Sequence, residues 1–374
     1  MRNTGSYIGR ISSGKEVFIG SASPNRHVLI TGISGSGKSV RIADIEYHIV
    51  NNGGTVIAFD IDGTHEKIDA EACQQISVKR DGLDVKLLDT TAPDGSKEAT
   101  AVIVQSVVKM ICPHQMRGAC QLAAVRKAVG YAIRNREKFE SDIEAIADGL
   151  KAQEEPAAAG AYNHLYEILE TGIFRPSKKG IQFGRINVIS LKGLDSRTQK
   201  RVIEIVLEVL WKQVRAEEGS KKHLTLVFDE FQNLDFHQDS VLSQLLTESR
   251  KYGINLILAT QTLSIFNKKE AAIINQAAIK LFFQPSTPDV KMVADLIDAE
   301  NKEKWSATLP RLRIGQAVTV GALEIGERLI NQPIITYSEY LEPENSLRAI
   351  NNVVTYEKLS KKASDKKIKE ECEC

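Results

Sequence analysis

The segment from Gly32 to Ser39 constrains this chain more than any other part, because it reads Gly-Ile-Ser-Gly-Ser-Gly-Lys-Ser. This spacing fits G-x-x-x-x-G-K-[ST], the phosphate-binding P-loop. Residues 27–31 predict a buried strand that runs into the loop, and residues 40–50 predict a helix that leaves it. A chance match is the alternative, but it would not explain these flanking patterns. A glycine-rich turn before a helix N-terminus gathers backbone N–H groups at the positive end of the helix dipole, so the sequence predicts an anion site.

This motif predicts a nucleotide as the ligand, with Mg²⁺ beside it. We expect Lys38 to reach the β- and γ-phosphates and the Ser39 hydroxyl to bind Mg²⁺. Glycines allow the backbone to wrap the phosphates because they carry no Cβ. The predicted nucleotide contacts are Gly32, Ile33, Ser34, Gly35, Ser36, Gly37, Lys38, Ser39 and Val40.

The composition is that of a globular protein, with 374 residues of which 42% are hydrophobic and 26% charged. The length predicts either one large α/β domain with an insertion or two domains. The net charge of +1 provides no overall positive field for nucleic acid or an anionic membrane. Any DNA contact must therefore come from a local patch or from a channel that several subunits form.

Targeting signals are not recognisable in the sequence. No apolar run reaches the roughly 20 residues of a membrane-spanning helix, and the first residues lack the apolar segment of a signal peptide. We therefore expect a cytoplasmic protein without a membrane segment.

Five scattered cysteines fit a reducing compartment. Cys112 and Cys120 lie close to His114 in the sequence, so a metal site is conceivable there. No second cysteine–histidine pair with metal-ligand spacing accompanies them, which argues against such a site. We expect Cys372 and Cys374, in the polar tail, to be free thiols.

Strands and helices alternate along most of the chain, which predicts an α/β fold with a mainly parallel central sheet. An entry hairpin is expected at 6–22 and a second core strand at 55–60, which places Asp60 and Asp62 at the ligand-binding edge. Later helices are expected at 196–216, 240–252, 269–277 and 288–304. Further strands are expected at 75–78, 85–88, 185–191, 224–230, 255–261, 280–283 and 316–320, the last of the series.

A helical block interrupts this alternation, with Pro156 and Gly160 marking a joint within it. We interpret this block as a packing subdomain. The predicted organisation is an entry hairpin (1–22), a first part of the ATPase core (23–97), an inserted helical subdomain (98–180), a second part of the core (181–340), and a C-terminal extension with a flexible Lys-rich tail (341–374).

Two carboxylates follow the apolar strand pattern at 224–228. In P-loop enzymes a carboxylate at this strand end holds Mg²⁺, so we assign Asp229 to the metal. A second carboxylate can polarise the attacking water, so we assign Glu230 as the catalytic base. An acidic strand end without function is the alternative, but the P-loop upstream favours the catalytic interpretation.

Gln261 and Arg250 complete the predicted catalytic set. Gln261 ends the next strand, and its amide can contact both the γ-phosphate and the lytic water. Arg250 lies at the end of the preceding helix, where it could neutralise charge in the transition state of a neighbouring subunit. A solvated helix end is an equally good explanation of Arg250 from chemistry alone.

Together these segments resemble the HerA/FtsK superfamily of hexameric, DNA-pumping P-loop ATPases, which also includes conjugation coupling and type IV secretion ATPases. The resemblance runs from about residue 15 to residue 325. Its specific part is Arg250-Lys-Tyr-Gly253 followed by the strand that ends in Ala259-Thr-Gln261. The resemblance extends to Phe59-Asp-Ile-Asp62 and to residues 313–321.

This resemblance implies a RecA-like P-loop NTPase fold, ATP on Lys38 and Ser39, and Mg²⁺ at Ser39 and Asp229. It implies Glu230 as the base, Gln261 as the sensor and Arg250 as a finger acting in trans, with Arg311 and Arg313 as competitors. It also implies a homo-oligomer, most simply a hexamer, with duplex DNA in a central pore. Candidate DNA contacts are Lys268 and Lys269, or Lys192, Arg197 and Lys200.

The chain departs from the family pattern, because we recognise no N-terminal β-barrel and no C-terminal winged helix. We therefore expect a partner protein, such as a nuclease or another effector, to supply loading or direction. Two alternatives stay open at this point. One is a conjugation- or secretion-type ATPase, and the other is an ATP-dependent scaffold that recruits an effector.

Overall fold

The computed structural model describes residues 6–20, 23–63, 65, 73–89, 96–111, 119–216, 223–234, 236 and 240–338. The chain forms two compact units, one of residues 1–75, 181–190 and 221–374 and the other of residues 76–180 and 191–220. The five predicted domain ranges stay predictions beside this division. The predicted tail and the Cys112 and His114 positions lie outside the described residues.

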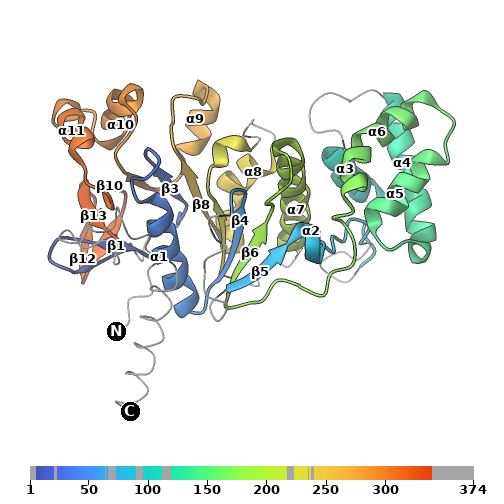
Figure 1. Cartoon of the computed structure of the whole chain (residues 1–374), viewed down its shortest axis with the longest axis horizontal. Coiled ribbons are helices and arrows are strands. Elements are labelled where there is room, and N and C mark those ends of the chain that lie inside the picture. Colours follow the sequence, from blue (N-terminus) through green and yellow to red (C-terminus); the bar gives the residue numbers. More distant parts are fainter. Residues whose placement is uncertain are drawn as a thin grey trace, which may run out of the picture. The chain divides into compact units, whose positions relative to one another are not determined.

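A sheet of 13 strands runs through the described residues, in the order β12-β11-β2-β1-β13-β10-β9-β3-β8-β7-β4-β6-β5 (Figure 1). Its strands are β1 (Tyr7–Arg10), β2 (Glu16–Ile19), β3 (Val28–Thr31), β4 (Thr55–Asp60), β5 (Cys73–Ser77), β6 (Ile186–Ser190), β7 (Leu224–Phe228), β8 (Ile254–Thr260), β9 (Ile279–Phe282), β10 (Gln316–Val320), β11 (Leu323–Ile325), β12 (Arg328–Ile330) and β13 (Ile334–Tyr337).

The helices are α1 (Lys38–Asn51), α2 (Val78–Asp81), α3 (Thr100–Ile111), α4 (Ala119–Asn135), α5 (Asp142–Lys151), α6 (Pro156–Thr171), α7 (Ser196–Ala216), α8 (Val241–Glu248), α9 (Lys268–Ile274), α10 (Val290–Ile297) and α11 (Lys302–Thr308). Helices α2 to α7 lie in the second unit, and the others lie in the first. No helix in the described part of the chain is both long and apolar enough to cross a membrane.

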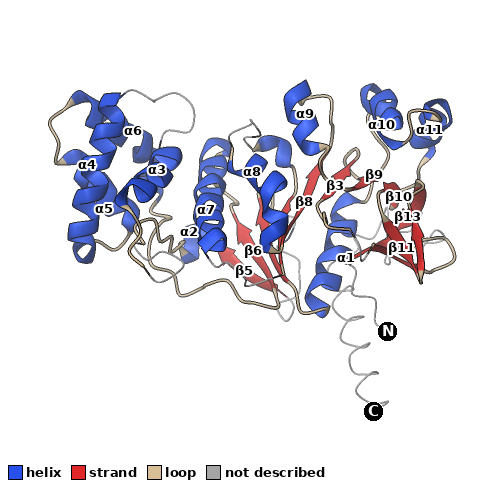
Figure 2. Cartoon of the chain, turned by 180° about the vertical axis from the view of Figure 1, so that it is seen from behind, coloured by secondary structure: helices blue, strands red, loops and turns tan. Residues whose placement is uncertain are grey.

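The centre of the sheet is parallel, which confirms the predicted α/β fold. Strand β3 pairs in parallel with β8 and β9, and β4 pairs in parallel with β6 and β7. Every residue of β3, β4, β6 and β7 is buried, as expected for strands covered on both faces. Parallel strands share one carboxyl edge, and α9, α10 and α11 lie at that edge of the first unit (Figure 2).

The other half of the sheet is antiparallel, and of this half the sequence predicted only the entry hairpin, which the pairing of β1 with β2 confirms. Strand β10 pairs antiparallel with both β9 and β13, and β1 pairs antiparallel with β2 and β13. The prediction that β10 is the last strand is wrong, because β11, β12 and β13 follow it. These strands are only three or four residues long, too short to carry a clear period-2 pattern.

A buried arginine, Arg41 of α1, links the two ends of the described chain to the phosphate-binding loop. Its side chain is 0% exposed and stacks over the ring of Phe283 at 5.6 Å. The guanidinium donates to four oxygens: Ser338 Oγ (2.9 Å), Ile8 O (3.0 Å), Thr336 Oγ1 (2.9 Å) and Gly315 O (3.2 Å). Gly315 in turn donates its N–H to the carbonyl of Ser36 in the P-loop, at 2.9 Å.

The predicted strand at 85–88 is wrong, because these residues form an irregular segment of the second unit. The N–H groups at 83 and 88 have partners outside any strand: Leu83 donates to the carbonyl of Ile173 (2.8 Å), and Leu88 donates to the carboxylate of Asp142 (2.8 Å).

Two predictions about helix boundaries are only partly confirmed. The predicted joint at Pro156 and Gly160 coincides with a helix start at Pro156 alone. Pro156 begins α6, where a missing N–H costs nothing, but Gly160 lies inside that helix. The predicted helix at 288–304 is two helices, α10 and α11.

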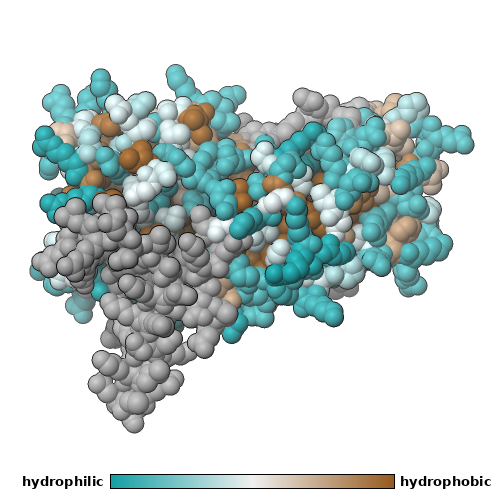
Figure 3. All heavy atoms as spheres, viewed as in Figure 1, coloured by the Kyte–Doolittle hydropathy of each residue, from teal (hydrophilic) through white to brown (hydrophobic). Residues whose placement is uncertain are grey.

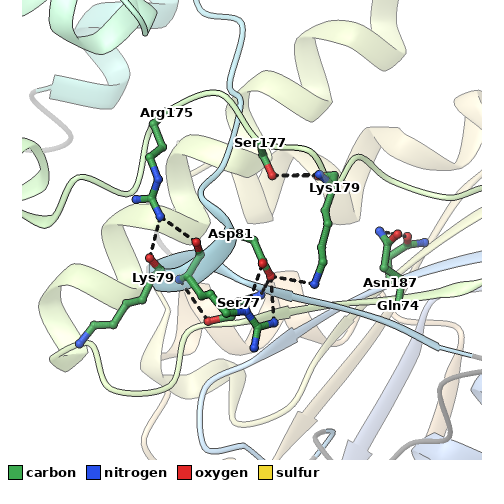
Figure 4. Close-up of polar contacts among 9 residues, drawn as sticks. Gln74, Ser77, Lys79, Asp81, Arg175, Ser177, Lys179 and Asn187 are labelled. Carbon is green, nitrogen blue, oxygen red and sulfur yellow. Dashed lines mark hydrogen bonds and ion pairs between the residues drawn. The ribbon is translucent and has the colours of Figure 1, made fainter.

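Within the second unit, a polar cluster holds the short helix α2 (Figure 4). Arg175 donates to the carbonyls of Lys79 (2.8 Å) and Arg80 (3.0 Å), which a helix of one turn leaves without intrahelical partners. Asp81 accepts from Lys179 at 3.0 Å. Hydrogen bonds from Arg80 and Lys179 hold the pKa of Asp81 well below its usual value. This cluster is explained by helix capping and needs no ligand.

The face of the molecule drawn in Figure 3 is mostly hydrophilic, with apolar side chains scattered over it. Among the described residues, the large apolar side chains with the greatest exposure are Phe183 (67%), Leu329 (59%) and Ile265 (56%). Single exposed apolar residues of this kind are normal on globular proteins.

Candidate functional site

The phosphate-binding loop follows β3 at the carboxyl edge of the parallel strands. Gly32 has a φ of +155°, and a Cβ there would lie 2.5 Å from the Cβ of Phe283, so only glycine fits. Gly37 has a φ of +105° and forms the N-cap of α1. The loop is fixed on both sides, since Gly32 N–H donates to the carbonyl of Thr260 (3.3 Å) and Ile33 N–H donates to that of Gln284 (2.8 Å).

Lys38 folds back over this loop. Its Nζ donates to the carbonyl oxygens of Gly32 (2.7 Å) and Ile33 (3.2 Å), and the residue is only 6% exposed. Burial lowers the pKa of the ammonium, while the charges of Asp229 and Glu230 act against that shift. The ammonium is therefore placed where the phosphates of a bound nucleotide are expected.

Ser39 and Asp229 form an oxygen pair next to Lys38. Ser39 Oγ donates to Asp229 Oδ2 at 3.2 Å, across 190 residues of sequence. Burial raises the pKa of Asp229, with Glu230 adding to the shift and His65, Lys38 and Ser39 opposing it. A hydroxyl and one carboxylate fit Mg²⁺, which usually takes one or two carboxylates, substrate phosphates and water. No group of three or more His, Cys, Asp or Glu side chains among the described residues could hold a metal ion.

Glu230 has an unusual backbone conformation, with φ +57° and ψ +43°. Among the described non-glycine residues, no other has a positive φ. Such a conformation costs about 1–3 kcal/mol and persists only where the surroundings enforce it. Two amides hold its carboxylate: Gln261 Nε2 donates to Oε1 at 2.8 Å, and Gln232 Nε2 donates to Oε2. The turn therefore aims the Glu230 carboxylate at the end of β8, where Gln261 lies.

The structure brings six predicted residues into this one edge of the first unit: Gly32, Lys38, Ser39, Asp229, Glu230 and Gln261. Asp62 lies near the same edge, within reach of the charge of Glu230. Burial raises the pKa of Asp62, and the charges of Glu230 and Asp60 raise it further. Arg250 is not part of this cluster. It precedes the amino-terminal end of β8 and is exposed, whereas Gln261 follows the carboxyl end of the same strand.

The other basic candidates are also dispersed. Arg311 and Arg313 are exposed on the segment before β10, which reaches the P-loop through Gly315. Lys268 and Lys269 begin α9 and are exposed. The remaining three, Lys192, Arg197 and Lys200, lie in the second unit, where Arg197 pairs with Glu167 at 3.1 Å.

Sequence reasoning missed a buried charged cluster next to the site, where His65 interacts with the charge of Asp229. His65 is 1% exposed and lies between two carboxylates, with Nε2 3.4 Å from Glu46 Oε1 and Nδ1 3.8 Å from Asp60 Oδ1. Burial would lower the pKa of His65, but the charge of Glu46 and the hydrogen bonds with Asp60 and Glu46 outweigh it and raise the pKa to about 10. Glu46 lies among the buried residues of α1, and no local sequence pattern links it to His65. Only the fold could reveal their contact.

This cluster predicts a pH dependence of stability. Because the pKa of His65 rises from 6.5 to about 10 on folding, its contribution is present in full below pH 6.5 and is lost as the pH rises to about 10. Urea unfolding at several pH values should show this loss in the wild type and not in His65→Gln. Parallel curves for the two proteins between pH 6.5 and pH 10 would contradict the predicted charge on His65.

Comparison with known proteins fits this geometry. Residues 6–210 match the family described as helicase HerA, central domain, which is more than half of the chain. The chain belongs to the HerA central-domain family. Residues 223–313 also match the family described as the TraM recognition site of TraD and TraG.

A curated relative of this HerA-family chain is the DNA double-strand break repair helicase HerA of Saccharolobus solfataricus. The two are 21% identical over 341 residues, which cover 85% of this chain and 66% of the relative. The chain therefore spans slightly less than two thirds of that relative's length.

Solved structures share the fold of this HerA-family chain. VirB4 of Thermoanaerobacter pseudethanolicus superposes with a TM-score of 0.66 at 15% identity, covering 92% of this chain and 99% of that one. The plasmid coupling protein TrwB in complex with ADP and Mg²⁺ superposes with a TM-score of 0.63 at 15% identity, covering 91% of this chain and 90% of that one.

Proposed function

We propose that this HerA-family chain is an ATP hydrolase that uses Mg²⁺ and works as a ring-shaped motor on DNA. The observation that carries the proposal is the pairing of Glu230 with Gln261 beside the Ser39–Asp229 pair and the P-loop lysine. A carboxylate base, an amide and a metal-binding pair at one sheet edge suit attack of water on a γ-phosphate. Glu230 follows β7 and Gln261 follows β8, so movement of either strand end would change the hydrogen bond between them.

Each residue then has a defined task in hydrolysis. When ATP binds, the Lys38 ammonium would release the carbonyl oxygens of the loop and donate to the β- and γ-phosphate oxygens instead. Mg²⁺ held by Ser39 and Asp229 would neutralise charge that develops on those phosphates. Glu230 would accept a proton from the lytic water, and Gln261, already bonded to Glu230, would orient that water and sense the γ-phosphate.

The position of Arg250 supports the proposed assembly. Arg250 lies away from its own chain's site, so an arginine finger at this position would act at a site on a neighbouring subunit. We therefore infer a homo-oligomeric ring, most simply a hexamer, with duplex DNA in its pore and Arg250 as a finger in trans. A nuclease or other effector as partner, and a cytoplasmic location, stay predictions from the sequence.

A conjugation-type ATPase is the second candidate. The match of residues 223–313 to the TraM recognition site of TraD and TraG favours it. That range contains Asp229, Glu230, Arg250 and Gln261, so this second candidate would use the same hydrolytic site. It differs only in what is moved and in the partner that recruits it.

The test is an ATPase assay with and without duplex DNA, run beside a mass measurement of the assembled protein. We expect turnover in a multi-subunit particle that duplex DNA accelerates. A single-chain particle with turnover that no nucleic acid changes would refute the motor. Acceleration by a partner protein and not by DNA would instead support the scaffold alternative.

Lys38→Ala should weaken binding of ATP by about 10- to 100-fold, because hydrogen bonds to a charged group contribute about 1.5–3 kcal/mol. Titration of a fluorescent ATP analogue would measure this change. The matched control is Lys15→Ala, which removes an exposed lysine of the β1–β2 turn. Equal affinities for Lys38→Ala and the wild type would remove Lys38 from the nucleotide site.

A further inference from the structure

Arg250 is exposed, yet the turn that carries it is closed on itself. The turn η4 (Ser249–Tyr252) is followed by Gly253 in a left-handed conformation, φ +75°. Gly253 N–H donates to the carbonyl of Arg250 at 3.2 Å. Ser249, which is 0% exposed, donates its hydroxyl to the carbonyl of Ile254 at 3.3 Å. The backbone of Arg250 is therefore fixed although its side chain reaches solvent.

A buried histidine from another part of the chain holds the strand that follows this turn. His27 precedes β3, is 1% exposed, and accepts the N–H of Leu256 on its Nδ1 at 3.1 Å. Its own backbone is anchored as well, because its N–H donates to Asn25 Oδ1 (2.9 Å) and its carbonyl accepts from Ile279 (3.2 Å). The histidine thus connects the start of β8 to the strand that leads into the P-loop.

The charge state of His27 suits this contact. Burial, and then the positive charge of Arg250, lower the pKa of His27 to about 4, while the backbone of Leu246 acts in the opposite direction. A neutral imidazole keeps the Nδ1 lone pair that the Leu256 N–H requires. Through the Leu256 N–H, His27 holds the strand that follows the segment carrying Arg250.

We propose that His27 is a positioning residue for Arg250, and that Ser249 assists it: together they hold the turn so that the guanidinium projects in one fixed direction. This inference rests on the proposed use of Arg250 in trans. A finger must enter a neighbouring site with its donors already oriented, because an ångström of misplacement can cost orders of magnitude in rate. A turn whose first residue, Ser249, is buried and whose following strand is held by His27 provides that orientation.

Two substitutions of His27 separate the hydrogen bond from the volume of the ring. His27→Phe keeps a flat ring and removes the acceptor for Leu256 N–H, whereas His27→Asn places an amide oxygen near the position of Nδ1. We expect His27→Phe to lower kcat about tenfold or more with little change in KM, and His27→Asn to keep at least about half of the rate. Binding of an ATP analogue should stay within about twofold for both.

Mixtures of variant subunits then show whether His27 acts on Arg250 or on the P-loop of its own chain. Lys38→Ala lacks a working P-loop but supplies Arg250, and Arg250→Ala has the opposite defect. We expect His27→Phe mixed with Lys38→Ala to regain activity, up to about a quarter of the wild-type rate for random, independent interfaces. His27→Phe mixed with Arg250→Ala should not exceed the rate of His27→Phe alone. The reverse pattern would place the effect of His27 in its own P-loop and overturn the inference.

The mixture of Lys38→Ala with Arg250→Ala separates this inference from the proposed function. If that mixture stays inactive in an assembled particle, Arg250 does not act in trans. The proposed finger and the positioning role of His27 are then both wrong. If it regains activity and the mixture of His27→Phe with Lys38→Ala does not, only the positioning role is wrong. If circular dichroism shows that His27→Phe does not fold, Ser249→Ala takes its place. We expect Ser249→Ala to lower kcat a few-fold and to show the same pattern of rescue.

Discussion

Glu230→Gln is expected to lower ATP turnover by about 10²- to 10⁴-fold, the usual contribution of a general base, and to leave ATP affinity within about twofold. The amide cannot accept the proton of the attacking water, but it has nearly the same shape as the carboxylate. The backbone at 230, with its positive φ, is unchanged by this substitution, so the turn and the neighbouring Asp229 should be retained.

Phosphate release and analogue binding, measured on the same preparation, would check this prediction. Glu327→Gln is the matched control, since it removes an equal charge from an exposed position between β11 and β12. Turnover by Glu230→Gln within tenfold of the wild type would show that another group activates the water. Loss of analogue binding would instead show that Glu230 shapes the nucleotide site.

Arg250→Ala should lower turnover of the assembled ring by about 10³-fold or more, because an arginine finger stabilises the charge of the transition state. The same variant should bind nucleotide normally, since Arg250 lies away from the P-loop of its own chain. Arg250→Lys should recover only a small part of the rate, because an ammonium lacks the planar fork of five donors.

The neighbouring residue provides the control for Arg250. Lys251 is exposed, and its ammonium lies 5.1 Å from the centre of the Tyr252 ring, so Lys251→Ala removes a positive charge from the same turn without touching the proposed finger. We expect it to keep most of the activity. Equal losses for the two alanine variants would point to the overall charge of the turn, and full activity of a single-chain particle would rule out any finger in trans.

The central part of this fold could be predicted because its signals are local. The P-loop pattern, the apolar strands and the position of polar residues just after strand ends place Lys38, Ser39, Asp229 and Gln261 at one edge of a parallel sheet, as the structure has them. Beyond the entry hairpin, the antiparallel half was missed because its strands are short and pair with partners far away in the sequence, such as β1 with β13.

The details of the site depend on contacts that no local pattern records. The positive φ of Glu230 and the amide of Gln232 that holds its carboxylate are set by the turn after β7. The pairing of His65 with Glu46 joins a loop to the buried face of α1, which has the pattern of an ordinary amphipathic helix. The roles of Asp229, Glu230, Gln261 and Arg250 stay predictions until the variants above are measured.

Arg41 makes the first and last strands of the described chain, β1 and β13, relevant to nucleotide chemistry. Removing residues before 10, or ending the protein ahead of 336, would delete acceptors of a guanidinium that has no access to water. An uncompensated cation in the interior is costly, so trimming either end should disturb the loop that Gly315 supports. Affinity tags and fusions are best attached through linkers that leave both of these strands intact.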